Sequence, residues 1–269
     1  MRKLRYPLLL VHGMGFRDSK LIGYWGRIPL ELERAGCRIY YGDQDANGSI
    51  EANGAVLAQR VKEIVRQTGA EKLNVIAHSK GGLDMRYAIS QLGIAEQIAS
   101  LTTISTPHHG SLTVDRLLRL PKPLVRLGAS CADLWLRLLG DRHPDTYGAI
   151  GALTTSAAAE FNQSCPDAPG VYYQSYAFVM KHIWSDMLMI VPAAVVRCIE
   201  GPNDGLLAPR AVEWTNFRGV FTGSGSRGIS HCDEVDLRRK RLSRRQGDGV
   251  SDITEVYLDI VNDLGSRGF

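Results

Sequence analysis

The segment Leu73-Asn74-Val75-Ile76-Ala77-His78-Ser79-Lys80-Gly81-Gly82 decides the fold, because an apolar run leads directly into a serine between small residues. In a nucleophile elbow the serine lies on a sharp strand-to-helix turn, and the residues two before and two after it must be small. Ala77 and Gly81 occupy those positions, so the motif is A-x-S-x-G. The pattern predicts a nucleophilic Ser79. The alternative is a structural turn capped by a serine.

A serine needs a base and an orienting acid before it can attack a carbonyl. Asp204, in Asn203-Asp204-Gly205, follows the apolar run 193–199, and glycines and Pro202 shape a loop there. His231, in Gly228-Ile229-Ser230-His231, follows a stretch rich in glycine and serine. The order serine, acid, histidine is the one that α/β-hydrolases use. Asp204 is therefore the predicted acid and His231 the predicted base; on its own, Asp204 also fits an ordinary turn aspartate.

The oxyanion hole is predicted from two backbone amides. Leu8-Leu9-Leu10-Val11 has the composition of a buried strand and runs into His12-Gly13-Met14-Gly15, where this fold places one N–H donor. The second donor follows the nucleophile, at the start of its helix. Met14 and Lys80 are the predicted donors, and His78 is expected to point away from Ser79.

Length and alternation indicate one α/β-hydrolase domain over residues 1–269, with a mostly parallel sheet covered by helices on both faces. An amphipathic helix is expected over 51–68, closed by Gly69, and a last one over 252–264. The apolar runs predict strands at 6–11, 37–41, 73–77, 98–104, 171–179, 194–200 and 216–222.

Six segments together resemble the bacterial triacylglycerol lipases, most strongly the branch with the thermostable Bacillus-type and staphylococcal enzymes. The likeness runs from about Pro7 to Asp236 and is thin over 113–151. It implies hydrolysis of lipophilic carboxylic esters with Ser79, Asp204 and His231 as the triad and the Met14 and Lys80 amides as the oxyanion hole. The segments are Val11–Phe16, Tyr24–Gly26, Ile76–Gly82, Thr102–Gly110, Asn203–Gly205 and His231–Val235.

Residues 111–164 interrupt the alternation of strands and helices at the point where lipases insert a helical cap or lid. Leucines alternate there with basic residues such as Arg116, Arg119 and Arg126, so one face is suited to acyl chains or a lipid surface. We expect a cap that lines an acyl pocket. The alternative is a helical subdomain packed permanently on the core, and a moving lid and a fixed cap are equally compatible with the sequence.

No cofactor is required for this chemistry, but the resemblance raises the question of structural metals. The segment that carries zinc in the Bacillus-type enzymes is absent between Tyr41 and Leu73, so a zinc site is not expected. Related lipases bind calcium beside the catalytic histidine, and the candidate ligands here are Asp233, Glu234, Asp236 and Asp186. A solvated acidic turn is the alternative, since calcium takes six or more oxygens. His108 and His109 are interpreted as loop structure, with a metal site as the alternative.

The net charge of +4 arises from the run Arg238 to Arg245, which holds six of the 32 basic residues. It is interpreted as a solvated loop; attraction to an anionic lipid surface is the alternative. No aromatic residue interleaves with it, so no nucleic-acid partner is expected. The five cysteines are expected to be reduced. The first residues leave no room for a signal peptide, which favours a cytoplasmic enzyme over leaderless export.

The function expected from the sequence is that of a triacylglycerol lipase or carboxylesterase acting through an acyl-enzyme on a lipid or ester substrate, with transient contact to a lipid interface. A thioesterase or acyltransferase uses the same triad, and a non-catalytic hydrolase-fold binding protein is the alternative outside enzymes. The acyl-chain length is left open by the sequence.

Overall fold

The computed structural model describes residues 3–15, 23–138, 140–244 and 247–269. Phe16 and Arg245 of the predicted motifs lie outside these residues. Within them, six parallel strands form one sheet in the order β2-β1-β3-β4-β5-β6. The strands are β1 (Leu8–Val11), β2 (Ile39–Tyr41), β3 (Leu73–His78), β4 (Ile98–Ile104), β5 (Tyr172–Phe178) and β6 (Phe217–Phe221).

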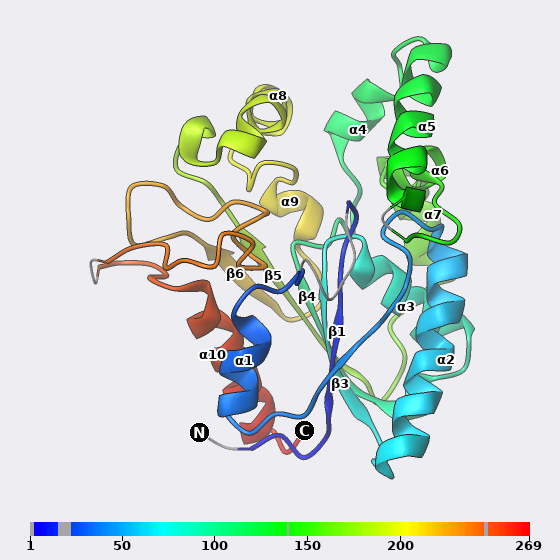
Figure 1. Ribbon diagram of the computed structural model, residues 1–269, viewed down its shortest axis with the longest axis vertical. Coiled ribbons are helices and arrows are strands. Elements are labelled where there is room, and N and C mark those ends of the chain that lie inside the picture. The colour runs from blue at the N-terminus through cyan, green and yellow to red at the C-terminus, as the bar shows by residue number, and fades with distance from the viewer. Residues whose placement is uncertain (1–2, 16–22, 139, 245–246) are drawn as a thin grey trace.

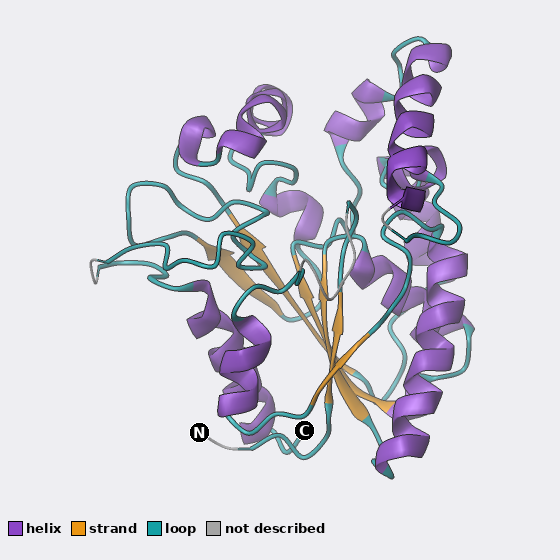
Figure 2. Ribbon diagram, in the orientation of Figure 1, coloured by secondary structure: helices purple, strands orange, loops and turns teal. Residues whose placement is uncertain are grey.

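The sheet is buried on both faces, which explains why β1 is continuously apolar and why β3 and β4 are mostly so. Leu8 and Leu10 pack into one core cluster, while Leu9 and Val11 pack into the other, because side chains alternate along a strand. Helices α1 (Ile28–Arg34) and α10 (Ile253–Ser266) cover the first face, and α2 (Ile50–Thr68) and α3 (Gly81–Gln91) cover the second. Figure 2 shows these helices on the two sides of the sheet. The expected α/β-hydrolase architecture is confirmed.

The two helices predicted over 51–68 and 252–264 are confirmed, and each has a capping residue. Gly69 ends α2 in the left-handed conformation, at φ 66°, where glycine is favoured. Asp252 precedes α10 and accepts a hydrogen bond from the Thr254 amide. Six of the seven expected strands are present, with ends that differ by up to two residues.

The strand expected at 194–200 is wrong, because this segment belongs to helix α8 (Ile190–Glu200). A short apolar run does not distinguish a strand from a helix by periodicity. Pro192 is compatible with the helix, since it lies in the first turn, where backbone N–H groups have no partner within the helix. Val191 and Val195 are exposed while Ala193 and Val196 are buried, so the apolar run lies on two faces of α8.

Residues 112–164 form a helical insertion between β4 and β5. Its helices are α4 (Leu112–Leu117), α5 (Lys122–Leu138), α6 (Thr146–Gly151) and α7 (Thr155–Ser164). In Figure 1, α4 and α5 lie above the sheet on one side and α8 lies on the other. The remaining helical segments are α9 (Pro209–Val212) and the short 3-10 turns η1 (Ala95–Gln97), η2 (Ile183–Ser185) and η3 (Met187–Met189). Over the part of the chain that the structure describes, no helix is both long and apolar enough to cross a bilayer.

Candidate active site

Ser79 lies between β3 and α3 in a strained backbone conformation. Its φ of 53° is in the left-handed region, which non-glycine residues rarely adopt and which the elbow turn requires. A Cβ on Gly81 would lie 2.2 Å from the His12 carbonyl oxygen, and one on Gly13 would lie 2.7 Å from the Ser79 Cβ. The small residues of the motif therefore let the elbow and the loop after β1 approach each other closely.

Asp204 and His231 are brought together as the sequence predicts. Asp204 Oδ2 lies 2.8 Å from His231 Nδ1, although the residues are 27 positions apart. Asp204 Oδ1 accepts hydrogen bonds from the Leu206 and Leu207 amides, both at 2.8 Å. The His231 amide donates to the Asp204 carbonyl at 2.7 Å. Both side chains are buried, so the pair has one fixed geometry.

The electrostatics of this pair prepare His231 to act as a base. Burial alone would raise the pKa of Asp204, but the charge and hydrogen bond of His231, together with the two amide donors, lower that pKa below its usual value. An ionised carboxylate only accepts hydrogen bonds, so the proton of neutral His231 must lie on Nδ1. The lone pair is then on Nε2, which is the nitrogen that can take a proton.

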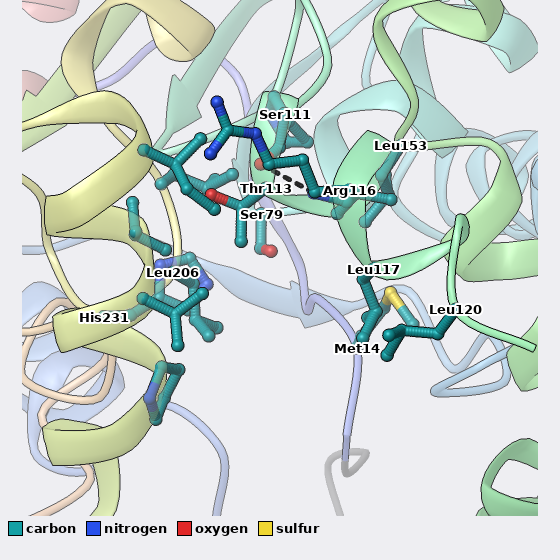
Figure 3. Close-up of a pocket in the computed structure, with 17 residues that line it drawn as sticks. Met14, Ser79, Ser111, Thr113, Arg116, Leu117, Leu120, Leu153, Leu206 and His231 are labelled. Carbon is teal, nitrogen blue, oxygen red and sulfur yellow. Dashed lines mark hydrogen bonds between the residues drawn. The ribbon is translucent and has the colours of Figure 1, made fainter. Parts of the chain in front are cut away.

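Ser79 and His231 line the same cavity, which has a volume of about 600 Å³. Figure 3 shows His231 on one side of Ser79 and Met14, Leu117 and Leu120 on the other. Among the described residues, no hydrogen bond joins the Ser79 hydroxyl to the imidazole. Such a bond often tightens only when substrate is bound, so the geometry is compatible with a nucleophile and base pair.

The two predicted amide donors flank the nucleophile. Within the described ranges, neither the Met14 nor the Lys80 amide donates to another group of the protein. Lys80 has its ammonium group turned away into a buried ion pair with Asp84 at 2.6 Å. Its backbone N–H is at the start of α3, where the helix dipole favours negative charge. Met14 lines the cavity beside Ser79.

The walls of the cavity come from α4 and α8 and are almost entirely apolar. The sequence predicts the α4 wall, whereas α8 was expected to be a core strand. Glu200 joins the two walls at their base, because its carboxylate accepts hydrogen bonds from Ser111 and Thr113 at the start of α4. The apolar lining residues are Val114, Leu117, Leu120, Leu153, Pro192, Val195, Val196, Ile199, Leu206 and Leu207.

A buried network behind the triad was not predicted from the sequence. Gly13 N–H donates to the Tyr24 hydroxyl at 2.9 Å, and that hydroxyl lies 2.6 Å from His78 Nδ1. His78 Nε2 lies 3.0 Å from Glu234 Oε2, which is 3.6 Å from His231 Nδ1. The expected direction of His78, away from Ser79, is thus explained by partners on the far side. The network therefore joins the loop after β1 (residues 12–15), which carries Met14, to the loop of residues 228–238, called the histidine loop because it carries His231.

Two pKa shifts keep this network uncharged. Burial, followed by the charges of His231 and His12, lowers the pKa of His78 well below its usual value. Burial and the neighbouring Asp204 raise the pKa of Glu234 well above its usual value. His78, His231 and Glu234 are close enough to hold a metal ion, the one such group among the described residues. Their hydrogen bonds already account for the arrangement, and the only local signal in the sequence is the acidic residue three positions after His231.

His108 and His109 are loop structure, as interpreted. His108 is buried and stacks on Trp214, and its two ring nitrogens lie 3.2 Å from Arg86 Nη1 and 3.0 Å from Thr103 Oγ1. His109 Nε2 lies 2.9 Å from the Glu213 carbonyl oxygen. In the basic run, Arg238 pairs with Asp233 and Arg241 with Glu255, so part of that run has structural partners.

Comparison with known families and proteins finds esterases and lipases. The family model described as "Putative serine esterase (DUF676)" matches residues 42–130. Triacylglycerol lipase 2 of Saccharomyces cerevisiae is 32% identical over 261 residues, covering 92% of this chain and 75% of its own. The triacylglycerol lipase of Vibrio cholerae is 31% identical over 232 residues, covering 76% of this chain and 72% of its own.

Solved structures share the fold at lower identity. The Staphylococcus hyicus lipase superposes with a TM-score of 0.73 at 17% identity, over 98% of this chain and 96% of that one. The mature Bacillus licheniformis lipase BlEst2 gives a TM-score of 0.69 at 19% identity, over 97% of this chain and 92% of that one. These two lipases therefore share the fold of this chain over nearly its whole length.

Proposed function

The chain belongs to the triacylglycerol lipase family and is an ester hydrolase, and from that premise we propose that it cleaves esters of medium and long acyl chains through an acyl-enzyme on Ser79. The observation that carries the proposal is the apolar cavity of about 600 Å³ that Ser79 and His231 both line. Fully buried methylene groups contribute about 0.8 kcal/mol each, so such walls favour long acyl chains.

The proposed reaction follows the geometry of the site. Ser79 Oγ attacks the ester carbonyl carbon while His231 Nε2 takes the hydroxyl proton. The Met14 and Lys80 amides stabilise the tetrahedral oxyanion, and Asp204 stabilises the imidazolium. The C–O bond to the alcohol then breaks, and the alcohol leaves with the proton from His231. Water, deprotonated by the same histidine, attacks the acyl-enzyme and releases the acid and free Ser79.

The helical insertion is proposed to act as a cap that forms one wall of the acyl site. Val114 and Leu117 of α4 line the cavity together with Leu120, which follows this helix, and α8 forms the facing wall. The lower part of the insertion is anchored to the body: the Asn47 side-chain amide donates to the Thr146 hydroxyl at 2.7 Å, and the Asp145 amide donates to the Asn47 carbonyl at 2.8 Å. These contacts support a fixed base for the cap.

Transient contact with a lipid surface is proposed for the rim of the cavity. Large apolar side chains are exposed on both sides of it, on α5 and on the segment that leads into α8. Exposed apolar side chains on these two parts of the rim are suited to partial insertion into the surface of a lipid phase. They are Leu124, Leu127, Leu134, Trp135 and Leu138 on α5, and Trp184, Met187, Leu188 and Val191 on the other side.

The test is a series of p-nitrophenyl esters from acetyl to palmitoyl, assayed with the wild-type protein and with Ser79→Ala. We expect kcat/KM to rise at least about tenfold from acetyl to octanoyl, since four or more methylenes become buried. The Ser79→Ala variant should have no measurable turnover. Strict preference for acetyl esters would contradict the proposed substrate class, and turnover by Ser79→Ala would contradict the nucleophile. Parallel assays with acyl thioesters test the thioesterase alternative, whereas the family assignment leaves the non-catalytic alternative without support.

A further inference from the structure

Two buried carboxylates meet directly behind the histidine loop. Asp233 lies two residues after His231, and Asp186 lies between η2 and η3, on the segment that leads into α8. Both approach Ser230: its hydroxyl oxygen is 2.6 Å from Asp186 Oδ2 and 3.0 Å from Asp233 Oδ2. The Ser230 hydroxyl has one proton, which cannot satisfy two carboxylates. A positive charge beside them stabilises two such groups out of water.

Arg238 supplies that charge from the same loop. Its Nε donates to Asp233 Oδ1 at 2.8 Å, its Nη2 also donates to Asp233, and Nη2 lies 3.7 Å from Asp186 Oδ2. The guanidinium has two N–H groups on one carboxylate and its charge beside the other, an arrangement that fixes direction as well as distance. The Arg238 side chain is 33% exposed, so it closes this cluster from the solvent side.

The other candidate calcium ligands are also used by the protein. Asp236 accepts hydrogen bonds from Arg27 Nη2 and Nε, both at 2.8 Å. Glu234 faces His78 and the triad instead of Asp233. The Ser185 carbonyl, next to Asp186, accepts from Arg227 Nε at 2.8 Å. Calcium needs six to eight oxygens, and here guanidinium N–H groups hold the oxygens that it would coordinate. The residues present do not fit a calcium site.

We infer that the Arg238 guanidinium takes the place of a structural divalent cation, so that the order of the histidine loop does not depend on calcium. The bridge ties Ser230, the neighbour of His231, to Asp186 at the base of α8. It thereby positions the base and one wall of the cavity together. Arg238 is a positioning residue, and the inference rests on the proposed function in so far as His231 is the base.

The experiment compares the wild type with Arg238→Ala and Arg238→Lys, each after EDTA dialysis and again with about 5 mM CaCl2, a concentration above the dissociation constants of weak protein calcium sites. Hydrolysis of p-nitrophenyl butyrate gives kcat and KM, and the midpoint of thermal unfolding gives Tm. The wild type should keep both kcat and Tm in EDTA and gain nothing from calcium. Arg238→Ala should lose up to about 100-fold in kcat with little change in KM, because a misplacement of about 1 Å has effects of this size.

Calcium should restore part of the kcat and Tm of Arg238→Ala, and Arg238→Lys should lie between wild type and alanine. The matched control is Arg244→Ala, an exposed arginine of the same basic run, which should behave as wild type. Wild-type activity that falls in EDTA and returns with calcium would contradict the inference, as would an Arg238→Ala enzyme that equals wild type or ignores calcium. If the wild type hydrolyses no ester, the proposed function fails, while the Tm series still decides the role of Arg238.

Discussion

At the scale of single residues, the site places a charged carboxylate and a neutral carboxyl group beside the same histidine. Asp204 has a lowered pKa and faces His231, whereas Glu234, 3.6 Å from the same imidazole nitrogen, has a raised pKa. Two ionised carboxylates that both approach one imidazole nitrogen would repel each other, so Glu234 carries a proton. The protonated Glu234 is held by its contact with His78 and, because it is neutral, does not compete with Asp204 for the His231 imidazolium.

The raised pKa of Glu234 predicts the pH dependence of stability. The unfolded chain ionises Glu234 above its ordinary pKa, near 4.5, while the folded protein keeps the proton. The stability that this group contributes is therefore complete below pH 4.5 and is lost as the pH rises toward the folded pKa. Glutamine does not ionise, so the Glu234→Gln variant does not lose this stability as the pH rises. Its Tm relative to wild type should increase between pH 4.5 and pH 8 by at least about 2 °C, the shift expected for about 1 kcal/mol in a domain of this size.

Thermal unfolding followed by circular dichroism across this pH range measures the effect. Glu96→Gln, at an exposed position, serves as the control and should follow wild type at every pH. If the Tm of Glu234→Gln runs parallel to that of wild type across the pH range, Glu234 ionises in the folded protein as it does in the unfolded chain, which would contradict the raised pKa.

The sequence predicts those site residues that belong to local motifs. Ser79 is marked by its strand and small neighbours, and Asp204 and His231 by their order. The partners of His78 could not be found in this way, because Tyr24 is 54 positions away and Glu234 is 156 positions away. Only the folded chain shows which polar residues share a buried space.

At the scale of elements, α8 supplies one wall of the cavity and α4 the other. A single sequence does not show that a run such as Ala193 to Ile199 is helical, because the exposed Val195 hides the periodicity of its buried face. The central strands were predictable because both of their faces are buried, so that their sequences are mostly apolar. The insertion was predictable as helical, whereas its pairing with α8 through Glu200 depends on contacts 87 and 89 residues apart.

Glu200 provides a test of this pairing. Burial alone would raise its pKa, but hydrogen bonds from Thr113 and Ser111 lower it, so the carboxylate stabilises the fold above its unfolded pKa near 4.5. That stability is lost as the pH falls through the folded pKa. Glu200→Gln should reduce the free energy of unfolding at pH 7 by about 1.5–3 kcal/mol, the range for hydrogen bonds to charged groups. The difference from wild type should shrink as the pH is lowered.

The same variant should raise KM for octanoyl esters more than for acetyl esters, since the walls of α4 and α8 lose their shared anchor. Urea unfolding at pH 7 and at pH 4, with ester kinetics at pH 7, makes the comparison. Equal stability of wild type and Glu200→Gln at pH 7 would contradict the role of Glu200.

At the scale of the whole molecule, the cavity opens between the helical insertion and the segment that leads into α8, and both carry exposed apolar side chains. Figure 1 shows α4 and α5 on one side and α8 on the other, above the carboxyl ends of the strands. Parallel α/β sheets bind their ligands at this edge. The arrangement places exposed apolar side chains around the mouth of the proposed acyl site.

The rim predicts a difference between dissolved and emulsified substrates. Met187 and Leu188 are 87% and 71% exposed, so replacing both with serine should leave the fold and the hydrolysis of dissolved p-nitrophenyl butyrate nearly unchanged. Hydrolysis of emulsified tributyrin should fall at least about tenfold, since removing two large apolar side chains from a lipid contact costs more than about 1.4 kcal/mol. Val220→Ser, at an exposed valine of β6, is the control. Equal loss on both substrates would contradict a role in surface contact.

The central claim, that Ser79 is the nucleophile of an ester hydrolase, is tested most directly by covalent labelling. Diethyl p-nitrophenyl phosphate transfers its phosphoryl group to an activated serine and releases p-nitrophenolate, and peptide mass spectrometry locates the adduct. We expect the adduct on the peptide that contains Ser79, its formation in step with the loss of ester hydrolysis, and neither labelling nor turnover in Ser79→Ala. An adduct on another residue that accounts for the lost activity, or hydrolysis by Ser79→Ala at the wild-type rate, would contradict the claim.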